Sequence, residues 1–122
     1  MPQYMLLLYA DPQTWMKLSP QDIQKAIGKY QAWGQKLQSK GILLASHKLA
    51  DDPGQVLRGK TGQVRVSDGP YSETKEVLGG YYLIESPNYA AAVEYSRDCP
   101  NLEYGGTVEV REVDAMTGAA KA

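Results

Sequence analysis

The stretch YMLLLYA, residues 4–10, carries an apolar or aromatic side chain at every position. Successive side chains of a β-strand point to opposite faces of a sheet, so a strand of this composition needs cover on both faces. The run ILLASH, residues 42–47, has the same character over most of its length. We therefore predict strands at residues 3–10 and 42–47, in a sheet whose two faces both require burial.

A long helix is predicted between these two strands. Ser19 can cap its first turn, Pro20 suits the first helical position, and Asp22 favours the positive end of the helix dipole. Gly41 stands where a helix would end. Apolar and small residues recur at helical spacing and mark the stripe that we expect to be buried: Ile23, Ile27, Tyr30, Gly34 and Leu37.

The second half of the chain predicts a strand, a helix and a final strand. The strand covers residues 78–85, and the helix covers residues 88–98, with Asn88 as its cap and Pro100 barring its continuation. The last strand is expected at residues 107–113, where Val108 and Val110 alternate with outward Glu109 and Arg111. A small hairpin, residues 55–58 and 63–67, is inserted before the third strand.

Without the hairpin, the order of elements is βαββαβ. The predicted fold class is therefore α+β, a ferredoxin-like antiparallel sheet with two helices on one face and an inserted small hairpin. The whole chain, 1–122, is expected to form a single domain with its core at about 3–113 and a flexible tail at 114–122.

Two helices cover only one face of such a sheet. An open apolar face of several hundred Å² is unusual on a monomer, so the other face should meet a second subunit or a ligand. We predict a homodimer, packed sheet face to sheet face, that closes a barrel-like core.

Composition excludes several classes of partner. With a formal net charge of -1, the chain has no electrostatic reason to bind nucleic acid or an anionic membrane. The apolar run at residues 4–10 is too short for a membrane span and lacks the basic flank of a signal peptide, so a cytoplasmic protein is expected. Cys99 and His47 are each the single residue of their kind, and no metal or nucleotide motif is present, so no cofactor and no metal are predicted.

The segment DGPYSETKE, residues 68–76, combines a turn signal with a cluster of charges. Asp68, Gly69 and Pro70 suit a tight reversal in which glycine adopts a positive φ. The charges that follow are those of a solvated segment or of a site. Because Asp68 and Lys75 flank a strand end, where a half-open barrel has its mouth, both are candidate catalytic residues, and Glu73 is a candidate ligand-binding residue.

His47 is the third candidate catalytic residue, because an unperturbed imidazole titrates near neutral pH. Paired with Asp68, it could serve as a general acid and base, with the carboxylate orienting the ring. The alternative is a partly exposed histidine at a strand end. Candidate ligand-binding tyrosines, which offer an apolar ring with a polar tip, are Tyr9, Tyr30, Tyr71 and Tyr82. The alternative for these is core packing, and neighbouring Tyr81 and Tyr82 must point to opposite faces of the sheet.

Several stretches together resemble a YCII-related, DGPF-type protein of bacteria: YMLLLYADPQTW, DGPYSETKEVLGGYYLIE and CPNLEYGGTVEVREV. The similarity covers roughly residues 3–113, and Tyr71 stands where the family usually has Phe. The resemblance implies a dimeric α+β barrel. It also implies no settled reaction, since members lack one and many are encoded beside, or fused to, extracytoplasmic-function sigma factors.

In the related YCII branch, a histidine of the first helix paired with an aspartate is proposed as an acid/base dyad. The corresponding position here is Tyr30, so the resemblance does not carry that dyad over. Two hypotheses follow. The first is a cofactor-free acid/base enzyme of isomerase, lyase or decarboxylase type, acting on a small polar or aromatic compound. The second is a non-catalytic metabolite-binding or regulatory module, associated with a sigma factor or other transcription machinery.

Overall fold

A four-stranded antiparallel sheet with helices on one side forms the body of the protein. The computed structural model describes residues 1–69 and 75–115. The sheet has the order β2-β5-β1-β6, with β1 at Gln3–Ala10, β2 at Leu43–Lys48, β5 at Val77–Glu85 and β6 at Thr107–Glu112. A separate two-stranded sheet joins β3, Gln55–Arg58, to β4, Arg65–Asp68.

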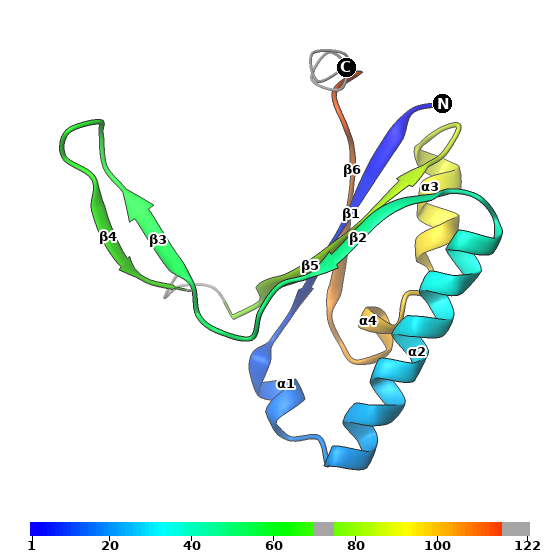
Figure 1. Ribbon diagram of the computed structural model, residues 1–122, viewed down its shortest axis with the longest axis horizontal. Coiled ribbons are helices and arrows are strands. Elements are labelled where there is room, and N and C mark those ends of the chain that lie inside the picture. The colour runs from blue at the N-terminus through cyan, green and yellow to red at the C-terminus, as the bar shows by residue number, and fades with distance from the viewer. Residues whose placement is uncertain (70–74, 116–122) are drawn as a thin grey trace.

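Two helices supply the second layer. The long α2, Pro20–Ser39, and the shorter α3, Tyr89–Ser96, lie on the same side of the sheet, whereas the β3–β4 hairpin projects on the other side (Figure 1). Leaving the hairpin aside, β1, α2, β2, β5, α3 and β6 follow the ferredoxin-like βαββαβ order. The predicted fold class is confirmed, and the sheet-to-sheet homodimer stays a prediction.

Helix caps place both main helices where the sequence predicts them. The Ser19 side chain accepts a hydrogen bond from the Asp22 amide at 3.1 Å, and the Asn88 side chain accepts one from the Ala91 amide at 2.9 Å. Two short helices were not predicted: α1, Pro12–Met16, and α4, Pro100–Glu103. Pro100 ends one helical segment as expected, but it also occupies the first position of α4, where its missing amide hydrogen has no cost.

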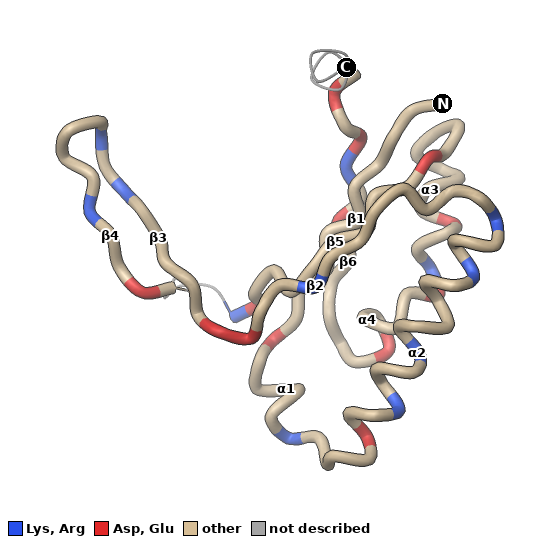
Figure 2. The backbone as a smooth tube through the Cα atoms, in the orientation of Figure 1, with Lys and Arg blue, Asp and Glu red and all other residues tan. Residues whose placement is uncertain are grey.

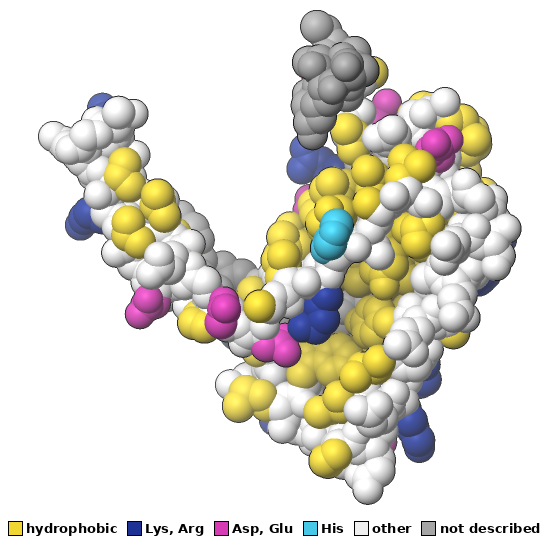
Figure 3. All heavy atoms as spheres, viewed as in Figure 1, with side chains coloured by type: hydrophobic (Ala, Val, Ile, Leu, Met, Phe, Trp, Pro, Cys, Tyr) yellow, Lys and Arg dark blue, Asp and Glu magenta, His cyan; other side chains and the backbone are white. Residues whose placement is uncertain are grey.

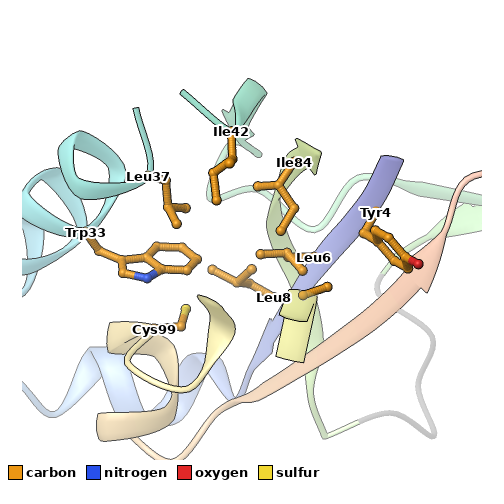
Figure 4. Close-up of a cluster of buried hydrophobic side chains, with 9 residues drawn as sticks. Tyr4, Leu6, Leu8, Trp33, Leu37, Ile42, Ile84 and Cys99 are labelled. Atoms are coloured by element: carbon orange, nitrogen blue, oxygen red, sulfur yellow. The ribbon is translucent and has the colours of Figure 1, made fainter. Parts of the chain in front are cut away.

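The core lies between the sheet and the helices. Its buried side chains come from β1, α2, α3, β5 and the segments beside them (Figure 4): Tyr4, Leu6, Leu8, Trp33, Leu37, Ile42, Ile84, Ala92 and Cys99. The predicted helical stripe was wrong at Ile27, which is 44% exposed. The buried residues of α2 are Ala26, Trp33 and Leu37, so the helix presents a rotated face and Trp33 takes the central place.

Two glycines in β5 allow a close approach of neighbouring backbone. The pairing of β1 with β5 passes from Leu8 opposite Gly80 to Tyr9 opposite Leu78, so Gly79 is the extra residue of a β-bulge. A Cβ atom on Gly80 would lie 2.8 Å from the carbonyl oxygen of His47. The predicted explanation of this glycine pair, a bulge and a close approach, agrees with both observations.

Gly69 corrects another expectation. Its φ is not among the positive values in the structure, so the turn does not require glycine for that reason. Instead, a Cβ atom at this position would lie 2.4 Å from the carbonyl oxygen of Pro53, and the Gly69 amide donates to the Gly54 carbonyl at 2.9 Å. Glycine is needed because two backbone segments meet there. Pro70 of the predicted turn lies outside the described residues.

Within residues 1–69 and 75–115, no helix has both the length and the apolar character needed to cross a membrane.

Candidate functional site

The face of the sheet turned away from the helices carries one row of side chains that crosses all four strands. His47 of β2 is opposite Tyr81 of β5, Tyr81 is opposite Leu7 of β1, and Leu7 is opposite Glu109 of β6. Directly opposite residues of antiparallel strands point to the same face. We call this surface the open face, because the helices do not cover it. The buried residues of β1, Leu6 and Leu8, point to the other face, which the helices cover.

One end of the row is a hydrogen-bonded pair. The Nδ1 atom of His47 lies 2.8 Å from the Tyr81 hydroxyl, and the two ring centroids are 5.5 Å apart. The His47 ring is exposed and Tyr81 is half-buried. Either partner can donate in this bond, depending on the tautomer, and in both cases Nε2 is left facing away from the tyrosine contact.

The other end of the row is a second hydrogen-bonded pair. The Tyr9 hydroxyl donates to Glu109 Oε1 at 3.1 Å. Burial, followed by the hydrogen bond to the Glu109 carboxylate, raises the pKa of Tyr9 above that of a free phenol. The guanidinium of Arg111 lies 3.9 Å from the other carboxylate oxygen of Glu109, at an exposed position. This end of the row therefore holds a proton donor, an anion and a cation together.

An apolar floor separates the two polar ends. Leu7 lies between them, and the adjacent row contributes Met5 from β1 and Leu83 from β5, all half-buried. Next to Tyr9, the Thr107 hydroxyl donates to both oxygens of the Glu76 carboxylate at 2.9 and 3.0 Å. The open face thus combines a surface that an apolar ring can cover with polar groups at its margins.

The predicted catalytic residues are not joined to one another by a hydrogen bond or an ion pair in the described part of the chain. Asp68 is the last residue of β4, where it is opposite Gln55, and Lys75 is an exposed residue shortly before β5. In the described part of the chain, neither a hydrogen bond nor an ion pair joins Asp68 or Lys75 to His47, whose ring contacts Tyr81 instead. Tyr71 and Glu73 lie outside the described residues.

The remaining predicted tyrosines are divided between the two faces. Tyr9 lies on the open face, but Tyr82 packs against Trp33 on the helix side with ring centroids 4.6 Å apart. The Tyr30 hydroxyl donates to Asn101 Oδ1 at 2.9 Å, also on the helix side. Burial raises the pKa of both Tyr30 and Tyr82. Tyr81 and Tyr82 do point to opposite faces, as predicted.

Sequence reasoning did not select Glu109 or Glu76 as site residues, and it considered Tyr81 only as the neighbour of Tyr82 on the opposite face. A signal for Glu109 was nevertheless present, because the alternation in residues 107–113 places it on the face opposite Val108 and Val110. The pairing of Tyr81 with His47 needed the register between β2 and β5. Over residues 1–69 and 75–115, no cluster of three or more His, Cys, Asp or Glu side chains is arranged to hold a metal ion.

Comparison with known proteins identifies the family. The family model described as the YCII-related domain matches residues 2–117. The chain belongs to the YCII-related family. It is also similar to an uncharacterized protein of Rhizobium meliloti (strain 1021), with 31% identity over 110 residues, which are 88% of this chain and 89% of that protein. The YCII-related part of the predicted resemblance is thereby confirmed.

Proposed function

We propose that the open face binds a small polar or aromatic molecule, and that His47 moves a proton on that molecule without a cofactor. The observation that carries the proposal is the single row in which two hydrogen-bonded polar pairs flank an apolar floor. Tyr81 and Glu109 are separated by two strand spacings, about 10 Å. That span suits one aromatic ring with a polar group at each end.

The chemistry follows from the two ends of the row. Tyr81 holds Nδ1 of His47, which leaves Nε2 as the atom that can take a proton from the ligand or return one. At the other end, Arg111 can bind a carboxylate of the ligand, and the Tyr9 hydroxyl can donate to a ligand carbonyl in exchange for its bond to Glu109. Proton transfer between fixed groups supports isomerase, lyase or decarboxylase chemistry.

A second candidate is a metabolite-binding or regulatory module without turnover. It is favoured by one observation: the ring partner of His47 is a phenol, so the described residues give the imidazole no carboxylate to stabilise its charged form. In this case the ligand would change the association of the protein with a partner, and the family resemblance suggests a sigma factor or related transcription machinery.

A homodimer is part of the proposal under either candidate. A second copy packed on the open face would cover Met5, Leu7 and Leu83 and turn an open surface into an enclosed site. Sedimentation velocity at micromolar concentration measures this directly, and a clean monomer would contradict it.

The test is a thermal-shift screen over small carboxylates, phenols and aldehydes, with product detection for every compound that raises the melting temperature. His47→Gln and Tyr81→Phe should abolish turnover while the fold is retained. The matched control is Ser46→Ala, which changes the neighbouring residue of β2 on the helix side, opposite Tyr82.

The outcomes separate the candidates. Loss of turnover in His47→Gln, with turnover kept in Ser46→Ala, supports the enzyme. Ligand stabilisation without turnover, lost in Tyr81→Phe, supports the binding module. If no compound in the screen shifts the melting temperature, or if His47→Gln leaves both binding and turnover unchanged, the open face is not the site.

A further inference from the structure

The β3–β4 hairpin, residues 55–68, is an arm that projects beyond the sheet on the side away from α2 and α3 (Figure 1). Its two strands pair only with each other among the described strands. The base of the arm is braced by short backbone contacts: Gly69 donates to the Gly54 carbonyl at 2.9 Å, and Gly54 donates to Asp52 Oδ1 at 3.0 Å. The arm is therefore held at a defined point.

The arm has one apolar face. Leu57 and Val66 are opposite each other in the ladder. Val64 stands just before β4, two residues from Val66, a spacing that in an extended chain puts two side chains on the same side. These side chains are exposed to 64%, 57% and 47% for Leu57, Val66 and Val64. The apolar side chains of the hairpin are visible on its surface in Figure 3. The other face carries Arg58 opposite Arg65.

Such an arm is not expected to be stable as an isolated element. A single two-stranded hairpin is marginally stable in water, and a ribbon with one apolar face gains stability when that face is covered. The described part of this chain leaves Leu57, Val64 and Val66 exposed. A partner seated on these three side chains would remove them from water.

We propose that the arm of one copy clasps a second copy of this chain, with the Leu57, Val64 and Val66 face seated on it. The inference rests on the homodimer proposed above, because the arm projects on the same side of the sheet as the open face (Figure 1). The arm thereby continues that interface beyond the sheet. A clasp of this kind would also bring the base of the arm, with Asp68, toward the partner's open face.

Charge supports a second copy as the occupant. The arm contains three basic residues, Arg58, Lys60 and Arg65, and one acidic residue, Asp68, so its formal charge is +2 (Figure 2). Because the whole chain has a formal charge of -1, the rest of the chain has a formal charge of -3. A basic arm and an acidic body attract each other between copies. The paired arginines Arg58 and Arg65 lie on the other face of the ladder from Leu57 and Val66, so a nucleic acid held by them would leave the apolar face uncovered.

The first experiment compares Val66→Glu with Ser67→Glu in the full chain. Both changes add the same charge to β4, but Ser67 is opposite Val56 on the other face. By sedimentation velocity over a concentration series, Val66→Glu should raise the dimer dissociation constant at least tenfold, and Ser67→Glu should change it by less than threefold. Far-UV circular dichroism should show the same fold in both variants, because both residues are exposed.

The second experiment places a photo-crosslinking amino acid at position 66 or at position 67. A covalent dimer from position 66 and little from position 67 supports the clasp. If the wild-type protein is a dimer, but position 66 gives no crosslink and Val66→Glu leaves the dissociation constant unchanged, the clasp alone is overturned. A wild-type monomer overturns the homodimer and the clasp together, and binding of the arm to anionic vesicles or to DNA in place of a second copy overturns the clasp.

Discussion

The buried side chain of Asn101 forms hydrogen bonds to residues of three other elements, α2, β1 and β6. It is 4% exposed, and its amide nitrogen donates to the carbonyl oxygens of Tyr9 at 2.8 Å and Thr107 at 2.9 Å. Its amide oxygen accepts the Tyr30 hydroxyl at 2.9 Å. The end of β1, the start of β6 and the middle of α2 are thus tied to α4 by a single residue.

Replacing Asn101 by alanine removes all three hydrogen bonds. Each is worth about 1 kcal/mol net, and a buried group left without a partner costs about 1 to 3 kcal/mol, so we expect Asn101→Ala to lower the free energy of unfolding by about 3 kcal/mol. For a domain of this size, that change corresponds to a fall in Tm of about 10 °C.

Urea unfolding followed by tryptophan fluorescence and by circular dichroism measures the effect, with an unchanged m-value as the check for two-state behaviour. The matched variant is Tyr30→Phe, which removes only the hydrogen bond to the amide oxygen and should cost about 1 kcal/mol. In the Asn101→Ala background the same change should cost close to nothing, because its partner is already gone. A loss below about 1 kcal/mol in Asn101→Ala, or strict additivity of the two changes, would refute this role of the Asn101 hydrogen bonds.

Two further predictions concern the sheet and the core. Gly80→Ala should lower the free energy of unfolding in urea by about 2 kcal/mol or more, because the new Cβ would lie 2.8 Å from the His47 carbonyl oxygen. Gly79→Ala should be tolerated, since the atom nearest to its Cβ would be 3.9 Å away. Equal effects of the two changes would contradict the close-approach argument. Burial raises the pKa of the Cys99 thiol to about 11, so alkylation by iodoacetamide at pH 8 should be ~200-fold slower in the native protein than in urea, from thiolate populations alone. Native alkylation as fast as in urea would exclude the buried position. The contribution of the neutral Cys99 thiol to folding stability is complete below the unfolded pKa of about 8.5, and it falls as the pH rises from there through about 11.

Local chemistry explains which elements of the fold were predictable from sequence. Ser19 and Asn88 cap helices with side chains that reach only a few residues along the chain, and β1 is apolar on both faces wherever it is placed. By contrast, the exposure of Ile27 depends on how α2 is rotated on the sheet, which is decided by the packing of Trp33 and not by helical spacing. The helix α1 was missed because Asp11 and Pro12, which begin it, are also a common turn signal.

The candidate site was less predictable because it depends on strand register. His47 was identified from its chemistry, but its partner was expected to be Asp68, which lies close to a strand end in the sequence pattern. The register of β2 against β5 places Tyr81 opposite His47 instead. A shift by one residue would have exchanged Tyr81 for Tyr82 on the open face, and nothing in the composition of the two strands fixes that choice.

The tyrosines show why chemistry is expected on the open face and not in the helix layer. On the helix side, Tyr30 is bonded to the amide of Asn101 and Tyr82 packs on Trp33, so both are held by groups that do not titrate. Within residues 1–69 and 75–115, no buried side-chain nitrogen or oxygen atom lacks a hydrogen-bond partner. On the open face, Tyr81 is bonded to the imidazole of His47 and Tyr9 to the carboxylate of Glu109. Within β5, strand parity alone separates Tyr82, which packs on Trp33, from Tyr81, which is bonded to His47.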